Sequence, residues 1–308
     1  MTSATTSPSP LVVVTGANGL VGSHVCTALS ERDGRVRAVV RRAGTAPRLP
    51  GVEEEVGDFT DPEFAAVVVQ GADAVVTTVH PMGSDRQTQH SIGVEATSAL
   101  ARAARDAGVA RLVHISTAAV YELSPQGGDV EESSQLVDDS AGDYAVTKRD
   151  TDAALAQVDG LTRVLIRPPA ILGNAESSVW NTLRPAVMAD EEQARHAIPE
   201  RSFPWVHVDD LAALAADVAM ARIAATTDLL RGPVTGECTP VNVAGSPATM
   251  RDYVGTVADA VGVDPVWDEG PAWTGDIDTS RARAWGWSPA VSLDQALSEL
   301  SDGLSERG

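Results

Sequence analysis

The sequence predicts an α/β fold built around a parallel, doubly wound sheet. Short apolar runs alternate with longer segments of helical pattern through the first half of the chain, and this βαβ rhythm is typical of parallel strands joined by helices. A glycine-rich turn directly follows the first apolar run. The 308 residues suffice for one large domain with a smaller annex.

The expected strands are short apolar runs at residues 11–15, 35–40, 52–56, 74–79, 111–115 and 161–167. The expected helices lie between these runs, at residues 19–32, 61–70, 86–107 and 141–158. Asp61-Pro62 is a typical helix start, and Gly108 is a typical helix end. After Gly173 the rhythm weakens to one further strand, 203–208, which a helix follows.

Composition excludes several classes of partner. The formal net charge of −20 argues against nucleic acid and against an anionic membrane surface. No apolar run reaches the roughly 18 residues of a membrane span, and residues 1–10 lack the pattern of a signal peptide. Two cysteines, Cys26 and Cys238, are too few for a disulfide framework. So few cysteines favour reduced thiols and a cytoplasmic protein. The six histidines show no metal-ligand spacing, so we expect no metal site.

The glycine-rich turn predicts dinucleotide binding. Gly16, Gly19 and Gly22 follow the first strand with the spacing G-x-x-G-x-x-G, which lets the backbone approach a pyrophosphate at the N-terminus of the next helix. We therefore assign the parts of the chain as follows: a disordered tail at 1–10, a dinucleotide-binding domain at 11–173 and 203–245, and a smaller C-terminal substrate-binding cap at 174–202 and 246–308.

The end of the second strand favours NADP(H) over NAD(H) as the cofactor. An acidic residue about 20 positions past the glycines usually holds the ribose 2′-hydroxyl of NAD, but here Arg41 and Arg42 stand at that distance. Two guanidinium groups suit a 2′-phosphate. Asp58, after the third strand, is either an adenine contact or a turn residue.

Tyr144 and Lys148 are the expected acid/base pair. Lys148 is the only lysine in the chain, and residues four apart share one face of a helix. The lysine ammonium and a cationic nicotinamide lower the pKa of a phenol, which allows Tyr144 to exchange a proton with a carbonyl or alcohol oxygen. Ser116 and Thr117, after the fifth strand, offer a second hydrogen bond to that oxygen, and the sequence does not decide between them.

Together these segments resemble the extended short-chain dehydrogenase/reductase superfamily, in its NAD-dependent epimerase/dehydratase-like branch. The similar stretches run from about residue 11 to the end of the chain: LVVVTGANGLVGSHV, GDFTD, ARLVHISTAAVY, DYAVTK, RPPAILG, FPWVHVDDLA and ARAWGWSP. The resemblance implies a Rossmann domain, a substrate-binding cap and a catalytic set of Thr117, Tyr144 and Lys148. VRAVVRR and TTVHPM are similar to NADP-using dihydroflavonol-reductase-like members, and the overall pattern is also similar to hydroxysteroid-dehydrogenase-like members.

The resemblance and the motifs above assign the cofactor contacts to Gly16, Asn18, Gly19, Leu20, Val21, Gly22, Arg41, Arg42, Asp58, Phe59, Val79, His80, Tyr144, Lys148, Pro168 and Ile171. Candidate substrate contacts are His80, Tyr121, Asn174 and Trp180. The expected partner is a small-molecule carbonyl or alcohol substrate. Relatives also suggest a homodimer formed through the helices at 86–107 and 141–158.

Two departures from the family pattern bear on function. His90 stands where members often have an asparagine on the fourth helix, and Ala170 replaces an asparagine usual in sugar-nucleotide enzymes. The leading hypothesis is an NADP(H)-dependent oxidoreductase that interconverts a ketone and an alcohol on a small organic substrate. One alternative is a sugar-nucleotide epimerase or dehydratase that retains NAD. The other is a non-catalytic NADP-sensing regulator.

Overall fold

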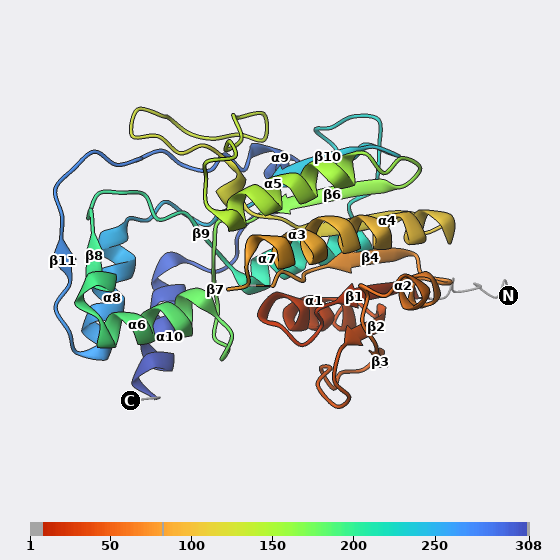
Figure 1. The fold of residues 1–308 in the computed structure, drawn as a ribbon, viewed down its shortest axis with the longest axis horizontal. Coiled ribbons are helices and arrows are strands. Elements are labelled where there is room, and N and C mark those ends of the chain that lie inside the picture. Colours follow the sequence, from red (N-terminus) through yellow and green to blue (C-terminus); the bar gives the residue numbers. More distant parts are fainter. Residues whose placement is uncertain (1–8, 82, 307–308) are drawn as a thin grey trace, which may run out of the picture.

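The computed structural model describes residues 9–81 and 83–306 (Figure 1). The disordered tail predicted for residues 1–10 therefore lies almost entirely outside the described residues. A seven-stranded parallel sheet lies between two layers of helices, and a smaller C-terminal region lies at one end of it. The predicted α/β fold class is confirmed.

The large sheet has the strand order β3–β2–β1–β4–β5–β6–β10, and every neighbouring pair is parallel. The order reverses between β1 and β4, so the carboxyl ends of these two strands border the crevice where doubly wound sheets bind ligands. The strands of this sheet are β1 (Leu11–Thr15), β2 (Arg35–Val40), β3 (Val52–Val56), β4 (Ala74–Thr77), β5 (Arg111–Ile115), β6 (Thr162–Arg167) and β10 (Cys238–Asn242).

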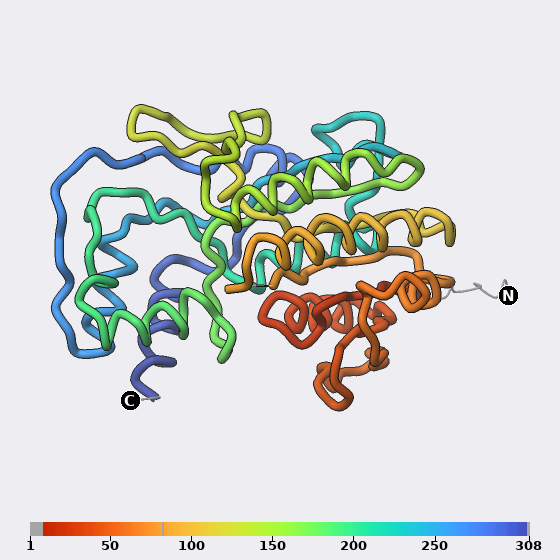
Figure 2. The backbone as a smooth tube through the Cα atoms, in the orientation of Figure 1, coloured from red at the N-terminus to blue at the C-terminus, as the bar shows by residue number. Residues whose placement is uncertain are grey.

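Helices cover both faces of the sheet. On one face, α1 (Leu20–Ser30) and α7 (Val208–Ala219) pack against each other and against the apolar side chains of the central strands. On the other face, α2 (Pro62–Val68), α4 (Thr97–Asp106) and α5 (Asp143–Ala156) close a second apolar core. The described N-terminal and C-terminal segments lie at opposite ends of the molecule (Figure 2).

The helix predicted over 86–107 is one helical run with a π-helical middle. It consists of α3 (Arg86–His90), the π-helical segment η1 (Ser91–Ala96) and α4. Gly93 lies within η1, and a Cβ at this position would be 3.2 Å from Thr147 Cγ2 and 3.3 Å from Thr151 Oγ1 of α5. The missing side chain therefore allows η1 to pack closely against the helix that carries Tyr144 and Lys148.

The C-terminal region has its own apolar core, in which Met188, Trp205, Tyr253 and Leu300 are almost completely buried. Two helices of this region begin at residues that suit a helix N-terminus, because Thr249 and Ser292 each form a capping box. Its elements are β7 (Ala170–Leu172), η3 (Val179–Leu183), α6 (Arg184–Asp190), η4 (Glu192–Arg195), β8 (His196–Ala197), β9 (Trp205–His207), α8 (Met250–Val261), β11 (Val266–Trp267) and α10 (Leu293–Ser305).

One part of the predicted cap packs elsewhere. The segment containing α9 (Ser280–Ala284) lies beside β10, and Trp285 and Trp287 join the core of the large sheet. The two indole N–H groups donate to the carbonyl oxygens of Leu229 (2.8 Å) and Asp210 (2.9 Å). A tryptophan is buried stably where its ring finds apolar surface and its N–H finds an acceptor, and the large domain offers both.

Within residues 9–81 and 83–306, none of the helices is both long enough and apolar enough to cross a bilayer.

Candidate cofactor-binding and catalytic site

The glycine loop leaves the N-terminus of α1 uncovered. Gly19 precedes the helix and provides no side-chain cap, and Gly16 has a φ angle of 72°. A Cβ at Gly22 would lie 2.1 Å from the Gly16 carbonyl oxygen, so only glycine allows α1 to approach the loop this closely. This bare helix end, at the carboxyl edge of the sheet beside the strand-order reversal, fits a pyrophosphate.

Neighbouring residues of the predicted cofactor site surround this loop. Val79 lies against Gly16, since a Cβ there would be 2.9 Å from Val79 Cγ2. Asn18 is exposed at the tip of the loop, while Leu20 and Val21 are half-buried in the first turn of α1.

Two free guanidinium groups follow β2. Arg41 and Arg42 are exposed, and within the described part of the chain neither side chain has a hydrogen-bond or ion-pair partner. The loop after them is held by Glu54 of β3, whose carboxylate accepts from the backbone N–H groups of Gly44 (2.8 Å) and Ala46 (3.0 Å). The position is therefore basic and accessible.

Asp58 and Phe59 follow β3. The Asp58 carboxylate is exposed and accepts from the backbone N–H (2.9 Å) and the hydroxyl (2.8 Å) of Thr60, which is a turn contact. Phe59 is buried in the core beneath it. Both interpretations of Asp58 stay open, because the turn contact uses only one of its two oxygens.

Three predicted catalytic residues come together at the carboxyl end of β5. Lys148 is only 4% exposed, and its Nζ donates to the Ile115 carbonyl oxygen at 2.7 Å. Thr117, 5% exposed, hydrogen-bonds the Tyr144 side chain. The Thr117 hydroxyl also accepts from the Ala119 N–H at 3.1 Å, which starts the short helix η2 (Ala118–Val120).

The sequence predicts that the lysine ammonium, together with a bound cationic nicotinamide, lowers the pKa of Tyr144, whereas the protein groups around Tyr144 raise it on balance. Burial raises the pKa of Tyr144, the hydrogen bond to Thr117 lowers it, and Asp152 raises it further. Burial also lowers the pKa of Lys148 to about 8, against the opposing effect of Asp152. The prediction considered charge alone, whereas desolvation of both side chains has the larger effect here.

His80 lies at the same place. Its ring meets the Tyr144 ring edge-on, with centroids 4.8 Å apart. Burial, and then the charge of Lys148, lower the pKa of His80 to about 4, although Gln89 nearby acts in the opposite direction. Neither buried ring nitrogen has a hydrogen bond of good geometry to any described residue. His80 is therefore a neutral imidazole with unsatisfied polar atoms beside the phenol.

Ser116 and Thr117 face different partners. Thr117 reaches Tyr144, whereas buried Ser116 lies toward Asp152 and lowers the pKa of that carboxyl group. Successive residues of an extended segment point in opposite directions. Thr117 is therefore the hydroxyl of the two that lies beside the Tyr144 phenol.

Two candidate substrate residues make structural contacts. The buried Tyr121 hydroxyl donates to Asn242 Oδ1 (2.7 Å) and accepts from Arg167 (2.9 Å). Asn174 bonds Glu299 of α10 through its backbone N–H (2.9 Å) and its side-chain amide (3.0 Å).

Of the remaining predicted site residues, one lies in the core of the C-terminal region and two lie beside the large sheet. Trp180 packs edge-on against Phe203 and Tyr253 in the core of the cap. The Pro168 carbonyl accepts from the first N–H of η2 at 2.8 Å, next to Thr117. Ile171 is half-buried against the large core.

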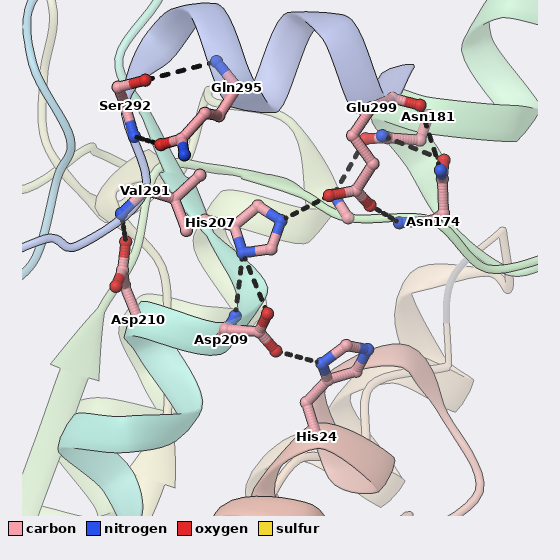
Figure 3. A network of polar contacts seen from close by, with 11 residues as sticks. His24, Asn174, Asn181, His207, Asp209, Asp210, Val291, Ser292, Gln295 and Glu299 are labelled. Atoms are coloured by element: carbon pink, nitrogen blue, oxygen red, sulfur yellow. Dashed lines mark hydrogen bonds and ion pairs between the residues drawn. The ribbon is translucent and has the colours of Figure 1, made fainter. Parts of the chain in front are cut away.

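Two polar clusters lie outside the sequence prediction. The first joins α1 to α10 (Figure 3): His24 Nδ1 lies 2.6 Å from Asp209, and His207 Nε2 lies 3.0 Å from Glu299. The His207 ring also accepts from the Asp209 N–H at 3.3 Å. Within the described ranges, no three His, Cys, Asp or Glu side chains are placed to hold a metal ion.

The second cluster is buried between α5 and β6. Asp152 accepts from Arg167 Nε at 3.0 Å, and the two side chains are 4% and 6% exposed. The only signal in the sequence is the position of Asp152, four residues after Lys148.

His90 occupies the position where members of the resembling family often have an asparagine, and its side chain is exposed. His90 is half-exposed, and its Nδ1 lies 3.5 Å from Glu95. His90 therefore does not replace the asparagine in bracing the interior of the site.

The fold and the glycine loop define a dinucleotide-binding α/β protein. The model of the NAD(P)H-binding family matches residues 16–221. The match covers more than half of the chain, so the chain belongs to this NAD(P)H-binding family.

Similar curated proteins match about half of the chain. The sterol demethylase protein B of Methylococcus capsulatus is 33% identical over 168 residues, which cover 52% of this chain and 51% of that protein. The 3 beta-hydroxysteroid dehydrogenase/Delta 5-->4-isomerase of Mycobacterium tuberculosis is 31% identical over 189 residues, 58% of this chain and 51% of that protein. The chain thus spans about half the length of these relatives.

Solved structures match along the whole chain. The NAD complex of the Bordetella bronchiseptica enzyme WbmG has a TM-score of 0.76 at 18% identity, covering 100% of this chain and 97% of that chain. The UDP-glucose 4-epimerase of Thermus thermophilus with NAD has a TM-score of 0.70 at 23% identity, covering 97% and 99%. At these identities the likeness shows the fold.

Proposed function

We propose that this protein is an NADP(H)-dependent oxidoreductase that interconverts a ketone and an alcohol on a small organic substrate. The observation that carries the proposal is the placement of Tyr144, Thr117 and Lys148 at the carboxyl end of β5, on the same edge of the sheet as the glycine loop. Relatives named as hydroxysteroid dehydrogenases support a hydroxyl or ketone as the reacting group.

The residues present fit a nicotinamide dinucleotide. The bare N-terminus of α1 would hold the pyrophosphate, and Lys148 has ammonium protons beyond the one it donates to Ile115. These protons would bind the hydroxyls of the nicotinamide ribose. When bound, the cofactor supplies or accepts the hydride.

Tyr144 moves the proton in this scheme. In the direction of reduction the phenol donates its proton to the ketone oxygen, and Thr117 donates a second hydrogen bond to the same oxygen. The raised pKa of Tyr144 keeps the phenol protonated for this role. In the direction of oxidation, Lys148 as an ammonium stabilises the phenolate that accepts the alcohol proton.

Preference for NADP(H) rests on Arg41 and Arg42. Both are exposed after β2, where NAD-binding sheets usually have a carboxylate. We expect Arg41→Ala to weaken NADPH binding about tenfold or more while NADH binding changes little, because only NADPH has the 2′-phosphate. Fluorescence titration measures both dissociation constants, and equal losses for the two cofactors would rule out a phosphate contact.

The catalytic test is Tyr144→Phe in an NADPH oxidation assay with a panel of cyclic and aliphatic ketones. We expect kcat to fall about 10²- to 10⁴-fold, because the proton donor is lost, with NADPH binding retained. Unchanged turnover would refute the role. Nicotinamide that co-purifies and is recycled without net oxidation would favour the retained-NAD epimerase instead. NADPH binding without turnover of any ketone would favour the regulator.

A further inference from the structure

Three ionisable side chains follow one face of α5. Tyr144, Lys148 and Asp152 are spaced four residues apart, which places them on successive turns. Lys148 and Asp152 are both almost completely buried. The helix therefore carries a buried cation and a buried anion directly behind the predicted acid/base residue.

Asp152 is fixed in this position from several sides. Its Oδ2 accepts from Arg167 Nε at 3.0 Å, and Arg167 also donates to the Tyr121 hydroxyl at 2.9 Å. Its Oδ1 is buried without a hydrogen bond to any described residue, although Ser116 lies toward the carboxylate. The carboxylate is therefore held by Arg167 through one oxygen and approached by the Ser116 hydroxyl, which fixes its place on the helix turn that follows Lys148.

The other groups that face Lys148 bring no compensating charge. His80 from the β4 side and His114 of β5 both act on Lys148 electrostatically, and burial lowers the pKa of each imidazole below its usual value. Tyr144, on the preceding turn, has a raised pKa and is a neutral phenol. Within the described residues, Asp152 is thus the one anion that acts on the lysine.

We propose that Asp152 is a positioning residue of the reaction centre: its buried carboxylate, held by Arg167, is the counter-charge that keeps Lys148 an ammonium beside Tyr144. The part of this role that concerns turnover rests on the proposed function; the charge on Lys148 does not. Burial alone favours a neutral amine at this site. An uncharged lysine neither stabilises a phenolate nor offers three donors.

The single lysine makes a direct test possible. Labelling with [¹³C,¹⁵N]lysine gives one lysine side-chain signal, from Lys148, whose shift is followed by NMR from pH 5 to pH 11. We expect the wild-type pKa near 8, and a fall of about one unit or more in Asp152→Asn, because an adjacent opposite charge is worth about 1–3 units. Asp152→Glu keeps the charge and should restore most of the wild-type value.

Asp150→Asn is the matched control. Asp150 is on the same helix, two residues away, but it is half-exposed and pairs with Arg149 at 2.7 Å. It should leave the Lys148 signal unchanged. A second variant, Asp152→Asn with Arg167→Gln, removes both buried charges together and guards against misfolding of the single substitution. A Lys148 pKa that is unchanged in Asp152→Asn and in the double variant would overturn the proposal, whatever the activity of the enzyme.

Kinetics give a second reading. In Asp152→Asn we expect kcat for alcohol oxidation to decline at a lower pH than in the wild type, because Lys148 loses its charge earlier, and Asp152→Glu should restore the profile. A kcat that is reduced equally at every pH would mean a merely structural role and would overturn the proposal. If the wild type oxidises no alcohol, the proposed function fails, and the NMR titration still decides the role of Asp152.

Discussion

The Asp152–Arg167 pair and the Asp209–His24 pair both join a carboxylate to a basic side chain, but they lie in different surroundings. Asp152 is 4% exposed and Asp209 is 63% exposed. Water screens the exposed pair, whereas the buried pair must compensate for the loss of hydration of both charges. Similar contacts therefore have different consequences. The buried pair affects the free energy of unfolding and the charge near Lys148, whereas the exposed pair mainly links α1 to α7.

The largest expected effect comes from breaking the buried pair on one side. Arg167→Met removes the directly bonded partner of the buried Asp152 carboxylate, and breaking a buried pair on one side costs about 3–5 kcal/mol. Urea unfolding measures the loss. Arg149→Met is the control, because its partners Asp139 and Asp150 are more exposed and it should cost no more than about 1 kcal/mol. Equal losses of unfolding free energy in the two variants would mean that burial does not determine how much such a pair contributes to stability.

A smaller effect should appear on acidification, through His80. The pKa of His80 is about 4 in the fold, against about 6.5 for histidine in the unfolded chain, so the unfolded chain binds more protons between these two pH values. Its contribution to stability is therefore lost as pH falls from about 6.5 towards 4. We expect the melting temperature of His80→Gln to fall less than that of the wild type between pH 7 and pH 5. An identical fall in both proteins would contradict a neutral buried imidazole.

Glu299 tests the half-exposed cluster. Glu299→Ala removes the acceptor for the Asn174 N–H and for His207, and we expect a loss of about 1–2 kcal/mol in urea unfolding. Asp302→Ala, an exposed change on the same helix, is the control and should cost little. A loss as large as that of Arg167→Met would mean that the half-exposed cluster contributes as much to stability as the buried pair.

The smallest effect should come from Asp209→Asn. The exposed contact with His24 contributes at most about 1 kcal/mol, and the difference from the wild type should shrink further in 1 M salt, where charges are screened within about 3 Å. Melting temperatures at low and high salt measure this. A loss that does not depend on salt would point to a hydrogen bond rather than to charge.

Local patterns were enough to predict much of the fold and of the site. The glycine loop and the Tyr144–Lys148 spacing depend on neighbours in the sequence, and the structure places them at one edge of the sheet. The Asp152–Arg167 pair joins a helix to the next strand, so only half of it is visible as a helical spacing. Contacts between distant segments, such as His24 with Asp209, leave no local signal.

The direction of the Tyr144 pKa could not be predicted for a related reason. The sequence shows which charges are near but not how completely water is excluded, and desolvation is the larger effect here. The sequence places Trp285 and Trp287 in the predicted cap because that part of the chain is rich in proline, glycine and tryptophan. Their indole acceptors, the carbonyls of Leu229 and Asp210, are far away in the sequence and could not be identified from it.

The burial of the single lysine has a practical consequence for chemical labelling. In the folded protein, Lys148 is almost completely buried and donates a hydrogen bond to the Ile115 carbonyl oxygen. An amine-acylating reagent therefore reaches it only when α5 separates locally from the sheet. The acylation rate of this one side chain, followed by mass spectrometry, therefore reports the opening free energy of the site. A bound cofactor would slow that rate in proportion to its affinity.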